Sequence, residues 1–459
     1  MRAASPRNPL LRSLSRPHGF EPLRVEGRLP EGLRGTLFRA GPGLFERFGK
    51  PVAHAFETDG AITAVRFGDG MALGATRIVE SAGYRDEEAA GRFLYNSSAS
   101  WLDRMRIARR GSSKSTGNTS AFLWQDRLFG LMEGGLPQEM DQDTLETLDA
   151  TDLGVIPGAF SAHPHRVASL RTTFNFGLRY GRKMQIDLFA LPDEGPARKL
   201  GTLEAPWQSM VHDFIATERH ILLLLGPVEL NLLRAMAGLA DITKLFRWRP
   251  ELGSRLFVVP LDDVNAARTY ELDPFWAWHI ANAFEEGGGP SLDICRLPTF
   301  GLDETDLVRS DGTAPLLTRL HLDFATGKAS ETRLFDVACE LPQIAPQVAG
   351  GRYGTVFAQT ERLDGNERLR GVTRIDLAGE RSAEWLVPNG HIPSEPMLVA
   401  RGEAEDDAWV LDLVYDGGRD TSYLAVLDGQ RLEEGPVATV HFDQPIPITF
   451  HGAFAAARW

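Results

Sequence analysis

Short strand-like runs recur along the whole chain, and they limit its possible folds more than any other feature. Alternating or β-branched residues occupy 61–67, 121–132, 172–178, 184–191, 215–225, 255–261, 316–324, 353–360, 409–415 and 423–427. Turn signals such as Gly68-Asp69-Gly70 separate these runs. No linker interrupts the 459 residues. The pattern predicts one large all-β domain, for which a β-propeller is the natural architecture at this length.

Helical periodicity is confined to two places. Apolar residues recur at helix spacing over 229–246, and a weaker pattern lies around 87–94. No sequence repeat of fixed period is evident, so any blades have diverged. We interpret residues 1–24 as an N-terminal extension and residues 25–459 as a single domain.

Composition excludes several classes of function. The net charge is −13, with 49 basic and 62 acidic residues and no basic block, which argues against binding to nucleic acid. The two cysteines, Cys295 and Cys339, are too few for a disulfide scaffold or a thiolate metal site and favour a reducing, cytoplasmic location.

The N-terminal residues lack a continuous apolar stretch, and we predict no signal peptide. The most apolar segment, 221–240, is interrupted by polar residues and predicts no transmembrane helix.

The chain lacks the common catalytic motifs. There is no Gly-Lys-Ser/Thr phosphate loop, no G-x-G-x-x-G, no G-x-S-x-G, no H-E-x-x-H and no paired C-x-x-C. Histidine is the residue type that remains, with eleven copies. Any one of them is best interpreted as a surface or satisfied core side chain. We treat His165 in this way.

Four histidines stand out by their surroundings. They occur in Ala162-His163-Pro164, His212-Asp213-Phe214, Trp278-His279-Ile280 and Phe450-His451-Gly452. The gaps between them are too long for a local metal loop, so only the whole fold can bring them together. Four neutral imidazoles would leave an octahedral divalent cation with its charge intact and two positions open, an arrangement suited to activating dioxygen.

These motifs resemble those of the carotenoid cleavage oxygenases, a family of non-haem Fe(2+) enzymes. The resemblance runs over nearly the full length, through Leu29-Pro30-Glu31-Gly32-Leu33, Gly117-Asn118-Thr119, Leu131-Met132-Glu133-Gly134-Gly135, His279-Ile280-Ala281-Asn282 and Phe450-His451-Gly452. It implies a seven-bladed β-propeller with a helical cap over the iron-bearing axis. It also implies that His163, His212, His279 and His451 hold Fe(2+).

The resemblance further implies three outer glutamates, Glu133, Glu340 and Glu395, bonded to His212, His279 and His451 respectively. Such carboxylates fix the tautomer and orientation of a ligating imidazole and offset the charge of the metal. The alternative is that they are three of many surface acids. Thr119 would lie near one open metal position by the same resemblance, and an ordinary turn threonine is an equally good interpretation.

A second implied feature is peripheral membrane contact through the segment from Leu222 to Phe246. Its apolar residues lie beside Lys244, Arg247 and Arg249, as in an interfacial helix. An equally good interpretation of this segment is an amphipathic helix that packs on the propeller. The sequence leaves the oligomeric state open.

The expected activity is oxidative cleavage, with O2, of a C=C bond in a carotenoid or apocarotenoid, giving carbonyl products. Met132 stands where relatives that split hydroxystilbenes carry a lysine, and a thioether cannot engage a phenol oxygen. This favours an apolar polyene. The alternatives are a stilbenoid or phenylpropanoid alkene as substrate, a propeller that binds apolar ligands without catalysis and, more remotely, a retinoid isomerase.

Overall fold

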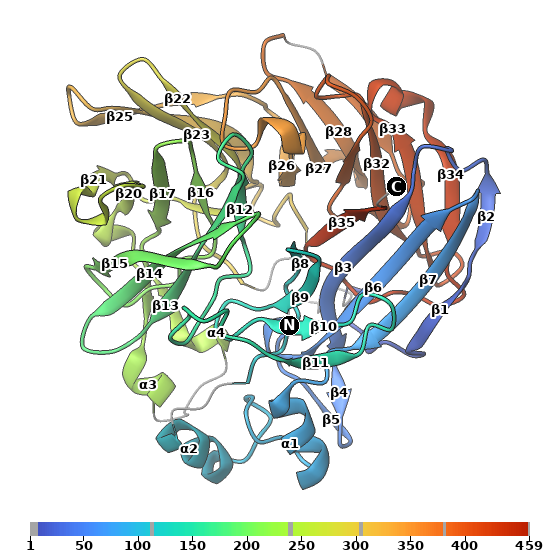
Figure 1. Cartoon of the computed structure of the whole chain (residues 1–459), viewed down its shortest axis with the longest axis horizontal. Coiled ribbons are helices and arrows are strands. Elements are labelled where there is room, and N and C mark those ends of the chain that lie inside the picture. Colours follow the sequence, from blue (N-terminus) through green and yellow to red (C-terminus); the bar gives the residue numbers. More distant parts are fainter. Residues whose placement is uncertain (1–7, 111–113, 237–241, 303–305, 380–381, 458–459) are drawn as a thin grey trace.

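The chain forms a ring of β-sheets in the computed structural model, which describes residues 8–110, 114–236, 242–302, 306–379 and 382–457. Within those ranges, seven sheets of four to six strands follow one another as blades of a propeller (Figure 1). The seven-bladed architecture inferred from the resemblance is confirmed.

The blades take their strands largely in chain order. Blade 1 is β1 (His18–Pro22), β7 (Met71–Ile78), β6 (Asp59–Gly68), β3 (Gly35–Leu44) and β35 (Gly452–Ala456). Blade 2 is β8 (Ser120–Trp124), β9 (Arg127–Leu131), β10 (Gln138–Met140) and β11 (Thr147–Ala150). Blade 3 is β12 (His165–Val167), β13 (Thr172–Arg179), β14 (Met184–Pro192) and β15 (Arg198–Ala205). Blade 4 is β16 (Phe214–Ala216), β17 (His220–Leu225), β20 (Ser254–Pro260) and β21 (Arg268–Leu272).

The remaining blades continue the pattern. Blade 5 is β22 (Trp276–Glu286), β23 (Gly289–Leu297), β24 (Leu316–Asp323) and β25 (Lys328–Arg333). Blade 6 is β26 (Ala338–Gln343), β27 (Thr355–Asp364), β28 (Glu367–Asp376) and β29 (Ser382–Leu386). Blade 7 is β30 (His391–Ile392), β31 (Met397–Ala400), β32 (Ala408–Asp416), β33 (Thr421–Asp428), β34 (Pro436–His441) and β2 (Arg24–Gly27).

The core lies between the blades. Buried apolar side chains form clusters at each of the seven interfaces between neighbouring sheets. Strand β17 shows why the sequence is continuously apolar there. Its side chains alternate, so that Ile221, Leu223 and Leu225 pack towards blade 3 while Leu222 and Leu224 pack towards blade 5. A strand buried on both faces needs apolar residues at every position.

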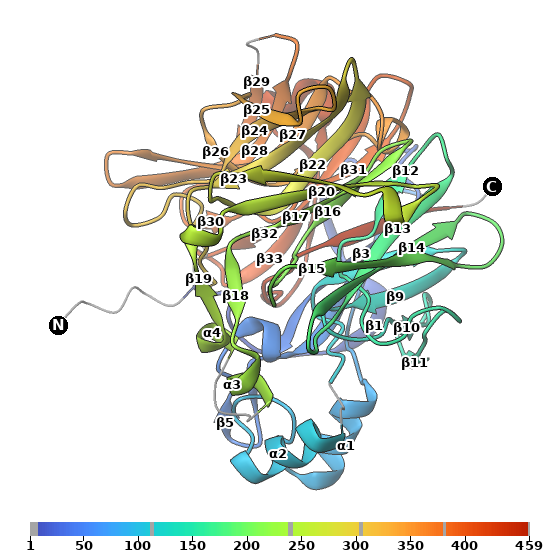
Figure 2. The same cartoon turned by 90° about the vertical axis from the view of Figure 1, so that its left-hand side faces the viewer.

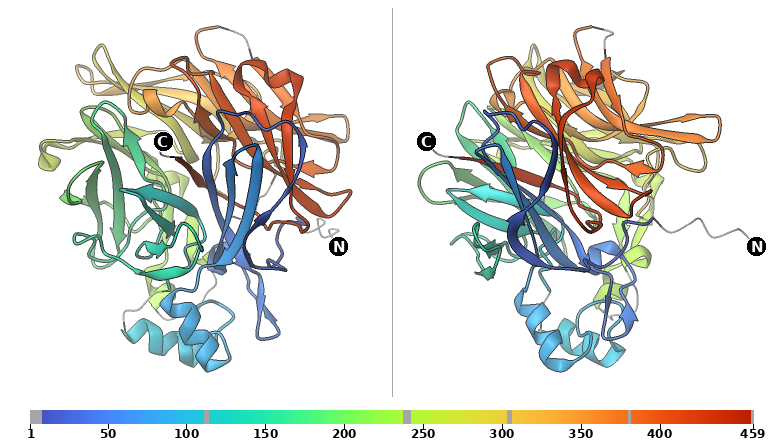
Figure 3. Two further views of the ribbon diagram at one scale, coloured as in Figure 1. Left: turned by 45° about the vertical axis from the view of Figure 1, so that its right-hand side comes forward. Right: turned by 90° about the vertical axis from the view of Figure 1, so that its right-hand side faces the viewer.

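Two exchanges of strands close the ring. The C-terminal strand β35 pairs with β3 of blade 1, and the early strand β2 pairs with β34 of blade 7. The blue and red ends of the chain therefore lie side by side in Figures 1 and 3. Strand β1, which belongs to the segment expected as an extension, pairs with β7.

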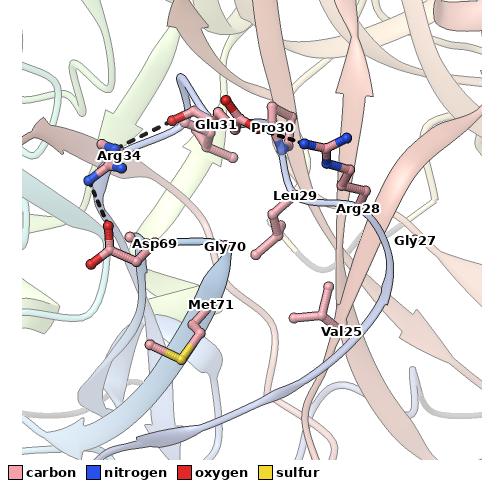
Figure 4. A pocket seen from close by; sticks show the side chains of 12 residues that line it. Val25, Gly27, Arg28, Leu29, Pro30, Glu31, Arg34, Asp69, Gly70 and Met71 are labelled. Atoms are coloured by element: carbon pink, nitrogen blue, oxygen red, sulfur yellow. Dashed lines mark hydrogen bonds and ion pairs between the residues drawn. The ribbon is translucent and has the colours of Figure 1, made fainter.

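A surface pocket of 430 Å³ lies at this junction (Figure 4). It is lined by residues around β2 and by the turn between β6 and β7. The Arg34 guanidinium pairs with Asp69 of that turn at 3.0 Å. Asp69 and Gly70 both have positive φ, as the predicted Gly-Asp-Gly turn requires. The pocket shares no lining residue with the cavity described below.

The α-helices gather at one end of the molecule (Figure 2). They are α1 (Ala82–Ala90), α2 (Trp101–Arg110), α3 (Leu232–Met236) and α4 (Ile242–Leu245). Short ribbons β4 (Glu46–Arg47) with β5 (Lys50–Pro51), and β18 (Val228–Leu230) with β19 (Phe246–Trp248), accompany them. The 3-10 helices are Ala55–Glu57, Pro250–Leu252, Val264–Ala266, Pro346–Val348 and Gly429–Glu434. None of the helices within the described ranges is long and apolar enough to cross a bilayer.

The continuous helical pattern expected over 229–246 is wrong as a single helix. The segment contains the end of β18, then α3, α4 and the start of β19, and residues 237–241 lie outside the described residues. Strands β18 and β19 pair with each other. This pairing buries Val228 and Leu230 and partly buries Phe246. Tertiary packing therefore outweighs the helical spacing of the apolar residues.

Candidate metal centre

Four histidines from four blades meet at the centre of the ring. His163 lies just before β12, His212 just before β16, His279 within β22 and His451 just before β35. The ring centroid of His163 lies 4.3 Å from that of His212, 5.5 Å from that of His279 and 4.6 Å from that of His451. The fold thus brings together the four histidines that the sequence singled out.

The ring nitrogens have the spacing of ligands to a single cation. One ring nitrogen each from His163, His212 and His279 lies within 4.8 Å of the others. The Nε2 atoms of His279 and His451 are 3.2 Å apart. Two donors at right angles, each about 2.1 Å from a metal, would be about 3.0 Å apart. Contact between Nε2 atoms at this distance therefore fits adjacent ligands.

His163 supplies the clearest test of fit. Its Nε2 is buried and has no hydrogen-bond partner among the described residues. A buried polar atom without a partner is costly, and a metal ion would satisfy it. Burial, reinforced by the neighbouring imidazoles, holds the pKa of His163 well below its usual value. Burial also lowers the pKa of His451. Neutral imidazoles of this kind are the form that binds a metal.

Three carboxylates orient three of the rings. His279 Nδ1 lies 2.6 Å from Glu340 Oε2, and His451 Nδ1 lies 2.8 Å from Glu395 Oε1. His212 Nδ1 contacts Glu133 Oε1. Burial lowers the pKa of His279, but the carboxylates of Glu340, Asp213 and Glu395 together outweigh burial and raise that pKa overall. The three expected His–Glu pairs are present, and the glutamates come from blades 6, 7 and 2.

Backbone irregularities aim two of these side chains. The register of β22 against β23 shifts on either side of Ile280, next to His279. The register of β26 also shifts after Glu340, and Leu341 has φ of 53°. Bulges and positive φ at a non-glycine residue reorient side chains next to functional sites. The Leu341 N–H donates to Glu340 Oε2 at 3.0 Å and fixes the carboxylate further.

His451 is held between two strands. Its N–H donates to the Thr119 carbonyl at 3.1 Å, and its carbonyl accepts from the Ala40 N–H at 3.0 Å. A Cβ at Gly41 would lie 2.1 Å from the Ile448 carbonyl oxygen, so the segment before His451 packs against β3 only because residue 41 is glycine. These contacts dock the C-terminal segment on the propeller.

Arg39 is a part of the centre that sequence reasoning missed. It lies in β3, is 2% exposed, and donates from Nη1 to Glu395 Oε2 at 2.5 Å. It also donates to the Phe450 carbonyl at 2.9 Å. Burial alone would raise the pKa of Glu395, but His451 and Arg39 outweigh it and lower that pKa. An arginine within a buried apolar strand was the available signal.

A cavity of 640 Å³ opens beside the histidines. Three of the four rings line it, those of His212, His279 and His451, and so does Thr119, whose hydroxyl donates to Asn118 Oδ1 at 3.1 Å. Aromatic and aliphatic side chains supply much of the remaining wall, including Phe56, Trp278, Leu302, Ile392, Ile448 and Phe450. Its size is that of a site for a small organic ligand.

Asp412 gives the outer part of the centre a pH-dependent stability. Its Oδ1 accepts from the N–H and hydroxyl of Ser394, next to Glu395, and burial raises its pKa to about 7. The unfolded chain ionises Asp near pH 4, so this group's contribution to the free energy of unfolding is greatest below pH 4 and is lost as the pH rises through 7.

We therefore expect Asp412→Asn to gain stability relative to the wild type as the pH rises. The difference should grow by roughly 3 kcal/mol between pH 5 and pH 8, at about 1.4 kcal/mol for each unit below the folded-state pKa. Urea unfolding at pH 5, 6, 7 and 8 measures it. A difference that is the same at all four values would contradict the assignment.

Comparisons with known proteins agree with this architecture. The family model described as "Retinal pigment epithelial membrane protein" (RPE65) matches residues 14–456. Apocarotenoid-15,15'-oxygenase of Synechocystis sp. is 31% identical over 94% of this chain and 92% of its own length. Isoeugenol monooxygenase of Pseudomonas nitroreducens is 25% identical, with 94% of each chain covered. The crystal structure of cobalt-substituted Synechocystis ACO superposes with a TM-score of 0.89 at 27% identity, covering 98% of each chain.

Proposed function

Because the chain belongs to the RPE65/carotenoid cleavage oxygenase family, we propose that it oxidatively cleaves a carbon–carbon double bond of a carotenoid or apocarotenoid with molecular oxygen. The observation that carries this proposal is the convergence of four imidazoles, one with an unsatisfied buried Nε2, beside a cavity rich in apolar side chains that three of them line. The products would be two carbonyl compounds.

His163, His212, His279 and His451 would hold Fe(2+). When bound, ferrous iron supplies the activation of dioxygen that organic side chains cannot provide. Glu133, Glu340 and Glu395 would hold three rings in the tautomer that presents Nε2 to the metal, because each carboxylate faces Nδ1. Arg39 in turn holds Glu395. No side chain is required to move a proton.

The cavity would hold the polyene by exclusion of water and by shape. Trp278 stands edge-on to His212 at 4.7 Å between ring centroids, and Phe56 contacts Phe450 at 5.8 Å. These rings offer flat apolar surfaces to a conjugated chain. Thr119, buried and next to the His451 backbone, would restrict what can bind on its side of the metal.

The test is aerobic incubation of iron-loaded protein with an apocarotenal, a full-length carotenoid, resveratrol and isoeugenol. We expect aldehyde fragments of a polyene, identified by mass, with metal-free protein as the control. A phenol hydroxyl left without a partner costs about 1–3 kcal/mol, so kcat/KM for the two phenols should be roughly 5- to 150-fold lower. Cleavage confined to the phenols would favour the phenylpropanoid alternative, and polyene binding without products would favour a non-catalytic propeller.

One of the relatives is an isoeugenol monooxygenase, so isoeugenol is included among the substrates to test the phenylpropanoid alternative. Met132, which argued against a phenol, is half-buried and is not one of the residues lining the cavity. Preference between the two substrate classes therefore depends on the cavity wall, not on this position alone.

We further propose that the protein contacts membranes at its helical end. The segment expected for this role, from Leu222 to Phe246, is only partly suitable, since Leu222 to Leu225 are buried in β17. Leu233 of α3 is 81% exposed, and α2 adds Trp101 and Leu102, 51% and 60% exposed, with Arg109 and Arg110 in its last turn. An apolar surface beside basic residues suits anionic lipid.

This surface lies near the cavity. Pro51 lines the cavity, and its carbonyl accepts from the hydroxyl of Ser98, shortly before α2, at 2.7 Å. A polyene leaving the bilayer would thus have a short route to the histidines.

Trp101→Ala with Leu102→Ser should lower the affinity for phosphatidylserine vesicles by roughly a hundredfold or more, since burying each side chain gains about 1.5–3 kcal/mol. Co-sedimentation measures the bound fraction. Leu363→Ser, at an apolar residue of β27 that is 51% exposed, is the matched control and should bind like the wild type. Equal loss in both variants, or in neither, would contradict the assignment of the helical end.

A further inference from the structure

A further buried carboxylate, Asp213, joins three of the histidine-bearing segments. It is 5% exposed and lies between His212 and β16. Its Oδ1 lies 2.7 Å from Nε2 of His165, and its Oδ2 accepts from the Ile280 N–H at 2.7 Å. The Phe214 N–H also donates to Oδ1, at 2.8 Å. One side chain of blade 4 therefore bonds to blade 3 and to blade 5.

Each of these bonds ends close to a metal-binding position. His165 is two residues from His163, Asp213 follows His212 directly, and Ile280 follows His279. The register of β22 against β23 shifts at Ile280. The Asp213 side chain there accepts from the backbone N–H of Ile280 in place of a neighbouring strand. The His165 ring is itself held edge-on to Phe214 at 5.4 Å.

We propose that Asp213, with His165, is a positioning unit that sets the spacing of His163, His212 and His279 and so gives the centre its metal affinity. The proposal rests on the metal site of the proposed function. It also accounts for His163, whose ring is not bonded to any of the three glutamates. Its segment is fixed instead through His165, which sequence reasoning set aside.

The unit adds negative charge close to the site. Arg39 pairs with Glu395 and offsets one of the three glutamates, whereas Asp213 contacts an imidazole and two amides. A carboxylate beyond the ligands raises affinity for a divalent cation by attraction as well as by orientation. An ordinary structural carboxylate would stabilise the fold without affecting the metal, and this difference can be measured.

The test compares Asp213→Asn with Asp187→Asn. Asp187 is a buried carboxylate of β14, 1% exposed, that accepts from Arg179, Lys199 and Thr202 on its own blade. Both substitutions remove a buried charge and keep the side-chain size. Co2+ binding by the metal-free protein, in competition with a chelator, gives the affinity, and the visible absorption of bound Co2+ reports ligand geometry.

We expect Asp213→Asn to weaken Co2+ binding about 10–100-fold and to shift the absorption bands, as loss of a partner beyond the ligands does. Asp187→Asn should change neither, even if it lowers the melting temperature. His165→Gln, which keeps an N–H donor, should lose less affinity than His165→Ala, and this pair carries the test if Asp213→Asn does not fold.

If Asp213→Asn and His165→Ala both bind Co2+ with the wild-type affinity and absorption spectrum, the proposal is overturned. Asp213 would then only connect the three blades. A wild-type protein that binds Co2+ while these variants bind it equally well refutes only the positioning unit. A wild-type protein that binds no metal refutes the proposed function, and the positioning unit with it.

Discussion

Replacement of His279 by alanine is expected to abolish both metal binding and double-bond cleavage. The ring contacts His451 at 3.2 Å between Nε2 atoms and shares a site with His163 and His212. Its loss removes one donor and leaves Glu340, 6% exposed, without its imidazole partner. Among the described residues, the Leu341 N–H would then be the remaining donor to a buried carboxylate, which is unfavourable. Metal analysis after iron loading and aldehyde formation from an apocarotenal are the two measurements.

His220 offers a control of matched chemistry. Its Nδ1 lies 2.8 Å from Glu285 Oε1, so it forms a His–Glu pair like those of the centre, but on β17, away from the four rings. His220→Ala should keep iron and activity near the wild-type values. Iron retained at wild-type level in His279→Ala, or lost equally in both variants, would contradict the assignment of the ligands.

Replacement of Arg39 by methionine is expected to cause a large loss of stability. The Arg39–Glu395 pair is buried, with both side chains 2% exposed. Methionine fills much of the volume but leaves the Glu395 charge without its cation. Breaking a buried pair from one side costs about 3–5 kcal/mol. Because Glu395 holds His451, iron affinity should fall as well, and urea unfolding and metal analysis measure the two effects.

The surface pair of Arg12 with Asp420 is the control for this substitution. Its nitrogen–oxygen distance is 2.8 Å, but the side chains are 34% and 58% exposed. Solvent screens such pairs, so Arg12→Met should cost about 0–1 kcal/mol. Equal costs for Arg39→Met and Arg12→Met would show that the buried pair does not support the centre.

Much of the fold could be predicted because strand alternation survives in the sequence. The run at 172–178 corresponds to β13, whose Phe174, Phe176 and Leu178 alternate onto one face. The run at 184–191 corresponds to β14, which places apolar side chains on both faces, between blades 2 and 3 and between blades 3 and 4. The run at 215–225 was harder, because it contains two strands, β16 and β17, around a tight turn at Thr217. The connecting residues, Thr217-Glu218-Arg219, include no glycine, proline, asparagine or aspartate, so the usual turn signals are missing.

The site was predictable only in part. His163, His212, His279 and His451 could be chosen because their short motifs resemble those of a known family, and the three glutamates followed from the same resemblance. Asp213 and His165 were not chosen, because nothing local distinguishes a bridging carboxylate from a solvated one. Their role depends on three blades meeting, which spacing along the chain does not reveal.

X-ray absorption of the iron-loaded protein reports on the four-imidazole centre itself. We expect about one iron per chain, surrounded by four imidazole nitrogens at roughly 2.1 Å, with the outer-shell scattering that imidazole rings produce. Iron far below one per chain after anaerobic loading, or a shell dominated by sulfur or carboxylate oxygen, would contradict it.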